Sequence, residues 1–395
     1  MLEKDVIKLE DYYTVGVYKK RPVVIVRGSG AVVWDIEGRE YIDCVAGHGV
    51  AIVGHCHPKV VEAIKKQAER LITCPGIFYN DVRARLAQLV AEITPLGLEV
   101  CFFSNSGAEA VECAMKVARK YTGRRKFVAM MRGFHGRTMG ALSLTWKPEY
   151  RSGFEPLLGD VVHIPFGNVE KAKEVIDRET AAVFVEPIQG EGGVNVAPPG
   201  YLKALRDLCD ENGALLVFDE VQTGFGRTGR MFACEHWGVE PDIMCLAKGA
   251  AGGVPIGITI GRREVMNSLT PGSHGSTFGG NPLAMTAALA AINVIREEKL
   301  CEKAREMGAL LKNGLENAVS KSFLAREVKG LGLMIGIKLR RGVAGEIAFQ
   351  AVDKGVLLLT AGRNVIRLLP PLVINREQVG KVIDVLEEVL VNYSE

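Results

Sequence analysis

A lysine at the end of an apolar run is the residue of this sequence that most directly suggests chemistry. Lys248 follows the run IMCLA, residues 243–247, and precedes the glycine-rich stretch GAAGGVPIG. Burial disfavours the charged ammonium, so the pKa of a lysine in apolar surroundings falls. The neutral amine is a nucleophile toward an aldehyde, which is how Schiff-base lysines are activated. For an isolated lysine, however, a strand end that turns toward water is the commoner explanation.

A carboxylate at the end of a second apolar run favours a functional role for Lys248 over an ordinary strand end. Asp219 closes ALLVFD, residues 214–219. Ionisable groups at the carboxyl ends of two buried parallel strands project into the crevice where α/β sheets bind ligands. Pyridoxal phosphate (PLP) requires such a pair, because a lysine binds its aldehyde and an acid holds the proton on its ring nitrogen. Lys248 and Asp219 together therefore indicate a PLP site.

A third segment could bind the phosphate of that cofactor. The sequence SNSGAEA, residues 104–110, follows the apolar run VCFF and opens a helical pattern. Gly107 and Ala108 place little side chain in the way, so backbone N–H groups at a helix N-terminus can meet a phosphate. This signal is weak in isolation and gains specificity from Lys248 and Asp219.

Two other motifs suggest different chemistry. Gly224, Gly226 and Gly229 match GxGxxG, the dinucleotide fingerprint. That motif should begin at the strand end and open a long helix, whereas here EVQT intervenes and the following segment is short. A glycine-rich turn of the active site is the favoured interpretation, and a nicotinamide-dependent oxidoreductase is the alternative from another class. The sequence His55-Cys56-His57 lacks a second ligand cluster, so a turn before a proline is favoured and no metal is expected.

The elements that must position these residues belong to an α/β fold. Five apolar runs begin at residues 100, 126, 181, 214 and 243 and alternate with helical patterns. Strands buried on both faces that alternate with helices predict a mostly parallel sheet. Residues 22–45 alternate like an antiparallel hairpin, and the chain beyond about residue 300 has an α+β pattern. We expect a large PLP-binding domain over residues 51–295 and a small α+β domain built from residues 1–50 and 296–395.

Composition limits the class of protein. The chain has 395 residues, of which 48% are hydrophobic and 24% charged, an ordinary globular balance that suits two domains. The net charge of +3 is too small for a nucleic-acid-binding surface. For the basic run Lys19-Lys20-Arg21, a solvated strand entrance is the favoured explanation. Nine cysteines without a CxxC pair indicate reduced thiols.

No segment of the sequence has the pattern of a secretory signal or a membrane span. The N-terminal residues MLEKDVIKLEDYY lack an apolar core. The longest apolar stretch, Pro282–Ile295, is interrupted by Asn293 and is too short for a bilayer. Asn281 before it and Pro282 at its start are typical of a helix N-terminus, so we expect a buried helix there. We expect a cytoplasmic protein with neither a membrane nor a nucleic-acid partner.

Four motifs together resemble a known family. They are FDEVQTGFGRTGR from Phe218, LAKGAAGGVPIG from Leu246, GFHGRT from Gly133 and HGSTFGGNP from His274. In their content and order they resemble class-III aminotransferases of the acetylornithine/ornithine type, and the resemblance extends from about Val15 to the C-terminus. It implies fold-type I of PLP enzymes, which is like aspartate aminotransferase, and a homodimer with shared active sites.

The resemblance also implies roles for individual residues. Lys248 resembles the lysine that binds the cofactor covalently and acts as the catalytic residue, and Asp219 resembles the partner of the ring nitrogen. The other cofactor contacts that it implies are Gly107 and Ala108 at the phosphate, Phe134 stacked on the ring, Gln222 near the phenolic oxygen, Thr277 from the other subunit, and Glu220 and Val221 between Asp219 and Gln222. The substrate contacts are Arg137 for a carboxylate, Ser276 beside it, and Glu191 and Arg367 as a switch pair. Taken singly, each of these residues has an ordinary structural explanation.

Within the family, residues 16–58, 131–146 and 365–374 look closest to the aminotransferases that act on a carrier protein of the LysW type. This implies transfer of the terminal amine of a carrier-masked lysine or ornithine to 2-oxoglutarate, giving a semialdehyde and glutamate in lysine or arginine biosynthesis. The basic triplet Lys19-Lys20-Arg21 could steer such an acidic carrier. The alternatives are an N-acetylornithine aminotransferase and a free ornithine or 4-aminobutyrate aminotransferase. The sequence departs from its relatives at His48, Ala250 and Ala251.

Overall fold

The central sheet of the molecule is buried on both faces. In the computed structural model, which describes residues 2–393, alternate residues of its strands enter two different hydrophobic clusters. Phe127 and Ala129 pack on one side, whereas Val128 and Met130 pack on the other. This alternation follows from the two-residue period of a strand and explains the continuous apolar runs in the sequence. The seven strands, in spatial order, are β4 (Val100–Ser104), β12 (Gly257–Gly261), β11 (Ile243–Leu246), β10 (Leu215–Asp219), β7 (Thr180–Val185), β5 (Lys126–Met130) and β6 (Val161–Ile164).

The sheet is mixed: six of its seven strands run in the same direction, and β12 runs against them. The strands from β11 to β6 pair in parallel, whereas β12 is antiparallel to both of its neighbours. The prediction of a mostly parallel sheet is therefore confirmed. The sequence pattern does not predict β6 or the antiparallel β12, because both are short runs without a strong helix on each side.

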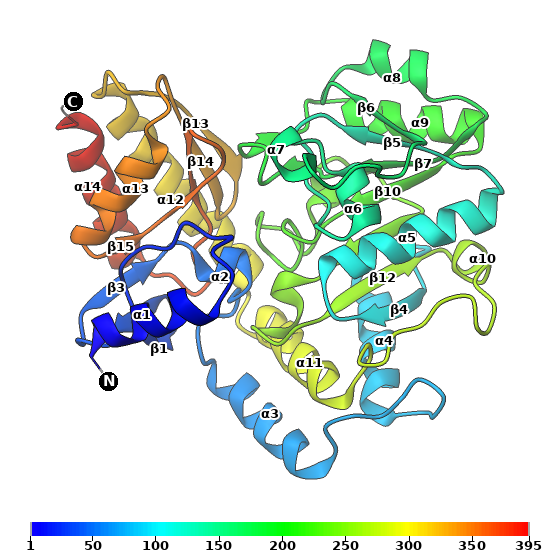
Figure 1. Ribbon diagram of the computed structural model, residues 1–395, viewed down its shortest axis with the longest axis horizontal. Coiled ribbons are helices and arrows are strands. Elements are labelled where there is room, and N and C mark those ends of the chain that lie inside the picture. The colour runs from blue at the N-terminus through cyan, green and yellow to red at the C-terminus, as the bar shows by residue number, and fades with distance from the viewer. Residues whose placement is uncertain (1, 394–395) are drawn as a thin grey trace.

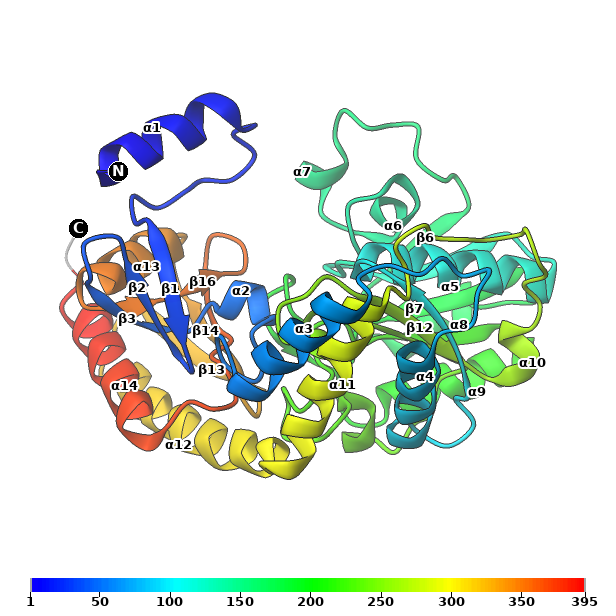
Figure 2. The same cartoon turned by 90° about the horizontal axis from the view of Figure 1, so that it is seen from below.

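Helices cover the two faces of the sheet (Figures 1 and 2). Helix α5 (Gly107–Thr122) contributes to one cluster and α9 (Tyr201–Asn212) to the other. Helix α11 (Pro282–Glu297) starts as predicted, since the side chain of Asn281 accepts a hydrogen bond from the Ala284 N–H group and Pro282 is the first helical residue. The remaining helices of this half are α3 (Pro58–Arg70), α4 (Asp81–Ile93), α6 (Met139–Leu144), α7 (Pro148–Arg151), α8 (Val169–Val175), α10 (Arg263–Met266) and the 3₁₀ turns η1 (Ala233–His236) and η2 (Lys248–Ala251).

The second half of the molecule combines both ends of the chain (Figure 1). An N-terminal sheet has the order β1 (Ile25–Ser29), β2 (Val32–Asp35), β3 (Glu40–Asp43) and β15 (Val356–Leu357), so its last strand comes from the C-terminal part. A C-terminal antiparallel sheet has the order β13 (Ala325–Leu331), β14 (Met334–Leu339), β17 (Val365–Leu368) and β16 (Leu359–Thr360). Because both ends of the chain contribute strands to this half, we keep the proposed domain boundaries near residues 50 and 295. The other elements of this half are α1 (Glu3–Tyr13), α2 (Ala46–Gly49), α12 (Leu300–Ser320), α13 (Ala344–Asp353) and α14 (Arg376–Val391).

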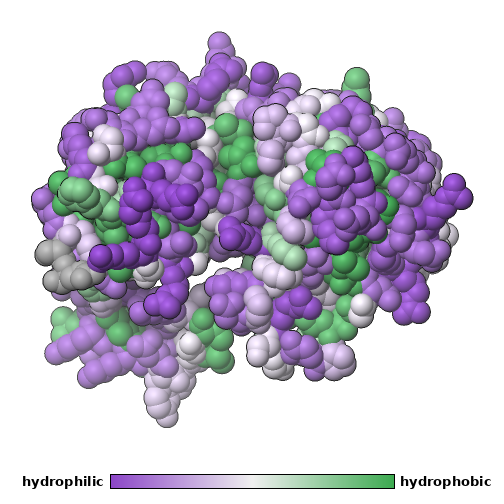
Figure 3. Space-filling model, turned by 90° about the horizontal axis from the view of Figure 1, so that it is seen from above, coloured by the Kyte–Doolittle hydropathy of each residue, from purple (hydrophilic) through white to green (hydrophobic). Residues whose placement is uncertain are grey.

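The two halves meet around a hollow, and the face shown in Figure 3 is mostly hydrophilic. Helix α1 has no buried residue and stands away from the sheets in Figure 2. A short hairpin of β8 (Ile188–Gln189) and β9 (Asn195–Val196) follows β7. No helix within residues 2–393 is long and apolar enough to cross a membrane.

Candidate active site

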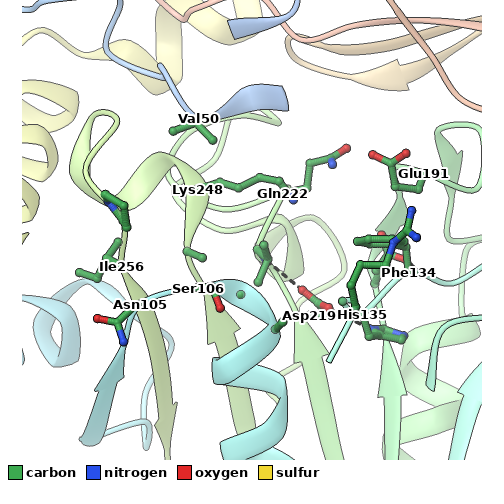
Figure 4. Close-up of a pocket in the computed structure, with 18 of the residues that line it drawn as sticks. Val50, Asn105, Ser106, Phe134, His135, Glu191, Asp219, Gln222, Lys248 and Ile256 are labelled. Atoms are coloured by element: carbon green, nitrogen blue, oxygen red, sulfur yellow. Dashed lines mark hydrogen bonds and ion pairs between the residues drawn. The ribbon is translucent and has the colours of Figure 1, made fainter. Parts of the chain in front are cut away.

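A pocket of about 430 Å³ lies where several parallel strands end (Figure 4). Strand β10 ends at Asp219, and Lys248 comes two residues after β11. Because parallel strands share one carboxyl edge, these side chains reach the same crevice, as the sequence predicted. The residues that line the pocket include Asn105, Ser106, Gly107, Ala108, Phe134, His135, Arg137, Glu186, Glu191, Asp219, Val221, Gln222 and Lys248.

Lys248 lies at the start of η2 with its side chain in the pocket (Figure 4). Its φ of 29° has the sign that L-residues rarely adopt, a kind of backbone strain that concentrates at functional positions. Burial lowers the pKa of Lys248, although the negative charges of Asp219 and Glu191 oppose this effect. The amine is therefore closer to its neutral, nucleophilic form than an exposed lysine would be.

The Asp219 carboxylate is buried and forms hydrogen bonds with His135 and with the backbone of Val221. Its Oδ2 atom lies 2.8 Å from Nδ1 of His135, and its Oδ1 atom accepts a hydrogen bond of 3.1 Å from the Val221 N–H group. Burial alone would lower the pKa of His135, but Asp219 outweighs burial and raises it. Asp219 is therefore fixed in orientation by hydrogen bonds to two neighbours.

The N-terminus of α5 forms another part of the pocket wall (Figure 4). The side chain of Ser106 accepts a hydrogen bond from the Glu109 N–H group and caps the helix. A Cβ atom on Gly107 would lie 2.7 Å from Cγ1 of Val221, so only glycine fits there. The first N–H groups of a helix have no acceptor within the helix and carry a partial positive charge. This part of the pocket is therefore suited to a phosphate.

An aromatic wall flanks the pocket. Phe134 lies edge-to-face with Tyr150, with 5.9 Å between the ring centroids. The guanidinium carbon of Arg137 lies 3.6 Å from the centroid of the Tyr150 ring and 5.6 Å from that of Phe134. Arg137 is thus held near the mouth of the pocket by cation–π contacts, with its charge exposed.

Glu191 and Arg367 form an ion pair between the two halves of the molecule. Arg367 lies on β17 and Glu191 follows β8, and the distance from Nη1 to Oε1 is 2.6 Å. The same Nη1 atom donates to Oε1 of Gln222 over 3.3 Å. Burial alone would raise the pKa of Glu191, but Arg367 outweighs it and lowers the pKa. The pair that the resemblance implied is therefore formed in this structure.

A second and larger cavity begins at this pair. It has a volume of about 1070 Å³, includes His48, and extends to the segment 18–26 and to α1. His48 adopts a φ of 63°. Burial lowers the pKa of His48, and the positive charge of Arg367 lowers it further. This cavity thus connects Glu191 and Arg367 with the N-terminal segment.

Four of the predicted site residues lie outside the smaller pocket: Glu220, Ser276, Thr277 and Arg367, the last of which lines the larger cavity. Glu220 is turned away from it, because its buried carboxylate accepts hydrogen bonds from the N–H groups of Ala233 and Cys234. Its side chain therefore does not line the smaller pocket, and its contact with the cofactor remains a prediction. Ser276 accepts a hydrogen bond from Asn105 over 3.2 Å and so reaches only the rim, next to Thr277.

The basic triplet is not a free positive patch. Lys20 lies 3.2 Å from Glu10 and 3.1 Å from Asp11, both on α1. Arg21 donates a hydrogen bond of 2.5 Å to the backbone oxygen of Leu358. Two of the three charges are therefore already engaged within the chain and attract an acidic partner less strongly.

Sequence reasoning missed two residues of the pocket, His135 and Glu186. His135 follows Phe134 within GFHGRT, and Glu186 comes directly after the apolar run of β7. The signal for Glu186 was the same as for Asp219, an acid at the end of a buried strand. For His135 no spacing signal exists, because its contact with Asp219 spans 84 positions.

The residues around the pocket fit PLP. The wall contains a lysine with a lowered pKa, a buried carboxylate and a helix N-terminus. Phe134 and Val221 add apolar surface for a flat ring. Within residues 2–393 no group of three or more His, Cys, Asp or Glu residues could hold a metal ion. His55 instead lies 2.7 Å from Asp43.

Comparisons with known proteins agree with this fit. Residues 13–390 match the family described as aminotransferase class-III. The chain is 52% identical over 387 residues to an acetylornithine aminotransferase of Methanopyrus kandleri, covering 98% of this chain and 99% of the relative. It is 48% identical to a [LysW]-aminoadipate semialdehyde transaminase of Deinococcus radiodurans, covering 97% and 89%. An ornithine aminotransferase structure from Toxoplasma gondii, with PLP at partial occupancy, superposes with a TM-score of 0.94 at 38% identity and covers 99% of this chain and 94% of its own.

The fold and the cofactor chemistry thus define a PLP-dependent enzyme of fold-type I. More particularly, the chain belongs to the class-III aminotransferase family. The GxGxxG match is a turn within this enzyme: Gly226 and Gly229 adopt positive φ, and the short η1 follows them instead of a long helix.

Proposed function

We propose that this enzyme transfers the terminal amine of an N-masked ornithine to 2-oxoglutarate, with N-acetylornithine as the donor. The observation that carries the proposal is the ion pair of 2.6 Å between Glu191 and Arg367. A terminal-amine donor has no carboxylate beside its reacting carbon, so an arginine that is already neutralised suits it. The name of the relative with 52% identity favours the acetylated donor over our first expectation of a carrier-linked one.

We propose that Lys248, Asp219 and the N-terminus of α5 hold PLP by its aldehyde, its ring nitrogen and its phosphate. When bound, PLP supplies an electron sink for the substrate carbon that loses a proton. Lys248 Nζ takes that proton and returns it, since its lowered pKa favours the neutral amine. Asp219 keeps the ring nitrogen protonated, and His135 keeps Asp219 in place.

The same site must then accept a dicarboxylate. We propose that Arg367 leaves Glu191 when 2-oxoglutarate enters and binds the carboxylate next to the reacting carbon as a bidentate pair. Gln222, already within 3.3 Å of Arg367, keeps the arginine oriented while its partner changes. Arg137 at the mouth is suited to the distal carboxylate of either substrate.

A donor linked to a carrier protein is the second candidate. The cavity of about 1070 Å³ that leads from Glu191 toward residues 18–26 supports it, because an extended peptide arm could reach the pair through this path. The relative from Deinococcus radiodurans, whose name refers to LysW, supports it as well. A side-by-side measurement of kcat/KM for N-acetylornithine, N-acetyllysine and the carrier-linked amino acids decides between the two. A carrier-linked donor with the highest kcat/KM would overturn our first choice.

We propose a homodimer in which Thr277 completes the site of the partner subunit. Exposed apolar side chains gather near this residue: Ile72, Ile77, Phe78, Tyr79 and Phe278. Arg83 ties their segments together, since it donates to the backbone oxygens of Cys74, Phe78 and Gly280. Large exposed apolar patches of this kind mark protein interfaces.

Mixing two inactive variants tests this arrangement. We expect Lys248→Ala and Thr277→Ala subunits, unfolded and refolded together, to regain activity, because a mixed dimer holds one site with both residues. Each variant refolded alone is the control. No regain of activity in mixtures shown by light scattering to be dimers would contradict the shared site.

A further inference from the structure

Glu186 is a buried acid in the pocket wall to which the proposed reaction gives no role. It follows β7 directly and is only 6% exposed. Val185 pairs with Phe218 in the sheet, so the next residues of the two strands, Glu186 and Asp219, emerge at the same edge. Its carboxyl group therefore lies among the groups that we assign to the cofactor site.

The two oxygens of Glu186 bind two different loops. Oε1 accepts a hydrogen bond of 2.9 Å from the N–H group of Phe134, the proposed ring-stacking residue. Oε2 accepts one of 3.1 Å from the N–H group of Gly190, the residue before Glu191. One carboxyl group thus connects the aromatic wall to the base of the switch carboxylate.

The two loops are also in direct contact. Gln189 donates to the backbone oxygen of Met131 over 2.8 Å. A Cβ atom on Gly192 would lie 2.5 Å from the backbone oxygen of Arg132, so the second loop passes close against the first. The two loops therefore pack closely against each other, and the hydrogen bonds of Glu186 connect both loops to the end of β7.

The pKa of Glu186 depends on its burial and on the charged groups around it. Burial raises the pKa of Glu186 to about 7, while the nearby His135 lowers it and Asp219 raises it. Lys248 is also close enough to be affected, since Glu186 raises its pKa. A buried acid that keeps such a position needs hydrogen-bond donors, and the Phe134 and Gly190 amides provide them.

We propose that Glu186 is a positioning residue that sets the distance between Phe134 and Glu191. The aromatic wall and the switch pair then keep the same relative position in both half-reactions. The proposal rests on the proposed function for the Glu191–Arg367 pair. Only a carboxyl group suits this position, because a glutamine has one acceptor oxygen and would point its NH₂ group at the second N–H group.

Amide hydrogen exchange of the holoenzyme tests the two contacts directly. In Glu186→Gln we expect one of the Phe134 and Gly190 amides to exchange at least about tenfold faster, because it loses its acceptor. In Glu186→Ala both should do so. Should the alanine variant fail to fold, the glutamine variant, which keeps its size, decides the question. Unchanged protection of both amides in Glu186→Gln would overturn the proposal.

Asp242→Asn is the matched control. Asp242 is buried before β11, at the other edge of the same sheet, and accepts a hydrogen bond of 2.7 Å from the Leu216 N–H group. We expect faster exchange near Leu216 in this variant and unchanged exchange at Phe134 and Gly190. Equal acceleration at Phe134 and Gly190 in both variants would mean general loosening and would also overturn the proposal.

The kinetic test separates this proposal from the proposed function. We expect Glu186→Gln to lower the ratio of kcat/KM for N-acetylornithine to that for glutamate about tenfold, since a displaced Glu191 pairs less well with Arg367. Glu186→Asp, which keeps both acceptor oxygens, should recover part of this ratio. An unchanged ratio in Glu186→Gln alongside a changed ratio in Glu191→Gln refutes the positioning role alone. An unchanged ratio in Glu191→Gln refutes the switch itself, whereas the exchange data still report on Glu186.

Discussion

Two charged clusters meet at the pocket, and they are built in different ways. Asp219, His135 and Lys248 all belong to one half of the molecule and extend from the edge of one sheet. Glu191 and Arg367 come from different halves of the molecule and form an ion pair where these halves meet. The first cluster is held by the sheet, so we expect its geometry to stay fixed during the reaction. The second joins two bodies, so it can exchange partners as substrates alternate.

The largest effect tests the first cluster. We expect Lys248→Ala to reduce turnover about 10³-fold or more, because it removes the proposed covalent anchor and the proton carrier together. Steady-state assays and circular dichroism would show lost activity with an intact fold. Lys329→Ala is the control, since Lys329 is half-buried and its pKa is also lowered by burial, but it binds Asn195 outside the pocket. Retained turnover with PLP bound would remove Lys248 from its role.

A smaller effect in the same cluster comes from Asp219→Asn. The amide keeps the shape but not the charge that holds the ring proton, so we expect kcat to fall about 10²-fold. Single-turnover kinetics and the absorption spectrum of the bound cofactor would measure the change. Asp242→Asn, which alters a buried carboxylate at the far edge of the sheet, should leave kcat within a few-fold. A comparably small loss in Asp219→Asn would assign the ring nitrogen to another acid.

The second cluster should respond to Glu191→Gln in a substrate-dependent way. Freed of its partner, Arg367 should favour carboxylates beside the reacting carbon. We expect activity toward N-acetylornithine to fall about tenfold while glutamate and 2-oxoglutarate react as well or better. Separate rates for the two half-reactions would show this. Glu327→Gln removes an exposed partner of Lys338 and serves as the control. Equal losses in both half-reactions would leave Glu191 with a structural role.

The smallest effect concerns the N-terminal segment outside both clusters. Lys19→Glu should change kcat/KM for N-acetylornithine less than about threefold, because exposed charges contribute little and are screened by salt. With a carrier-linked donor, the same variant should react more slowly at low ionic strength, if the carrier approaches past this segment. Lys381→Glu on α14 is the control. A salt-dependent loss with the carrier-linked donor alone would favour the second candidate function.

Much of the first cluster could be predicted from the sequence, and little of the second. Lys248 and Asp219 each end an apolar strand, and parallel strands place such residues at one edge. The same rule applied to the run before Glu186 would have found that residue too. Glu191 and Arg367 follow no shared local pattern, so only the resemblance to a family suggested them. Their contact depends on how two sheets meet, which no local periodicity encodes.

The pairing of β15 with β3 affects how the chain can fold. Residues 25–43 form three strands of their sheet early in the sequence, but the fourth strand is Val356–Leu357. During synthesis this sheet must keep an open edge until nearly the whole chain has been made. Contacts between residues so far apart slow folding, and an unpaired edge can associate with other chains. Removal of the residues after Asp353 would leave the same edge exposed, so such a shortened chain should aggregate even though every residue of the PLP pocket is still present.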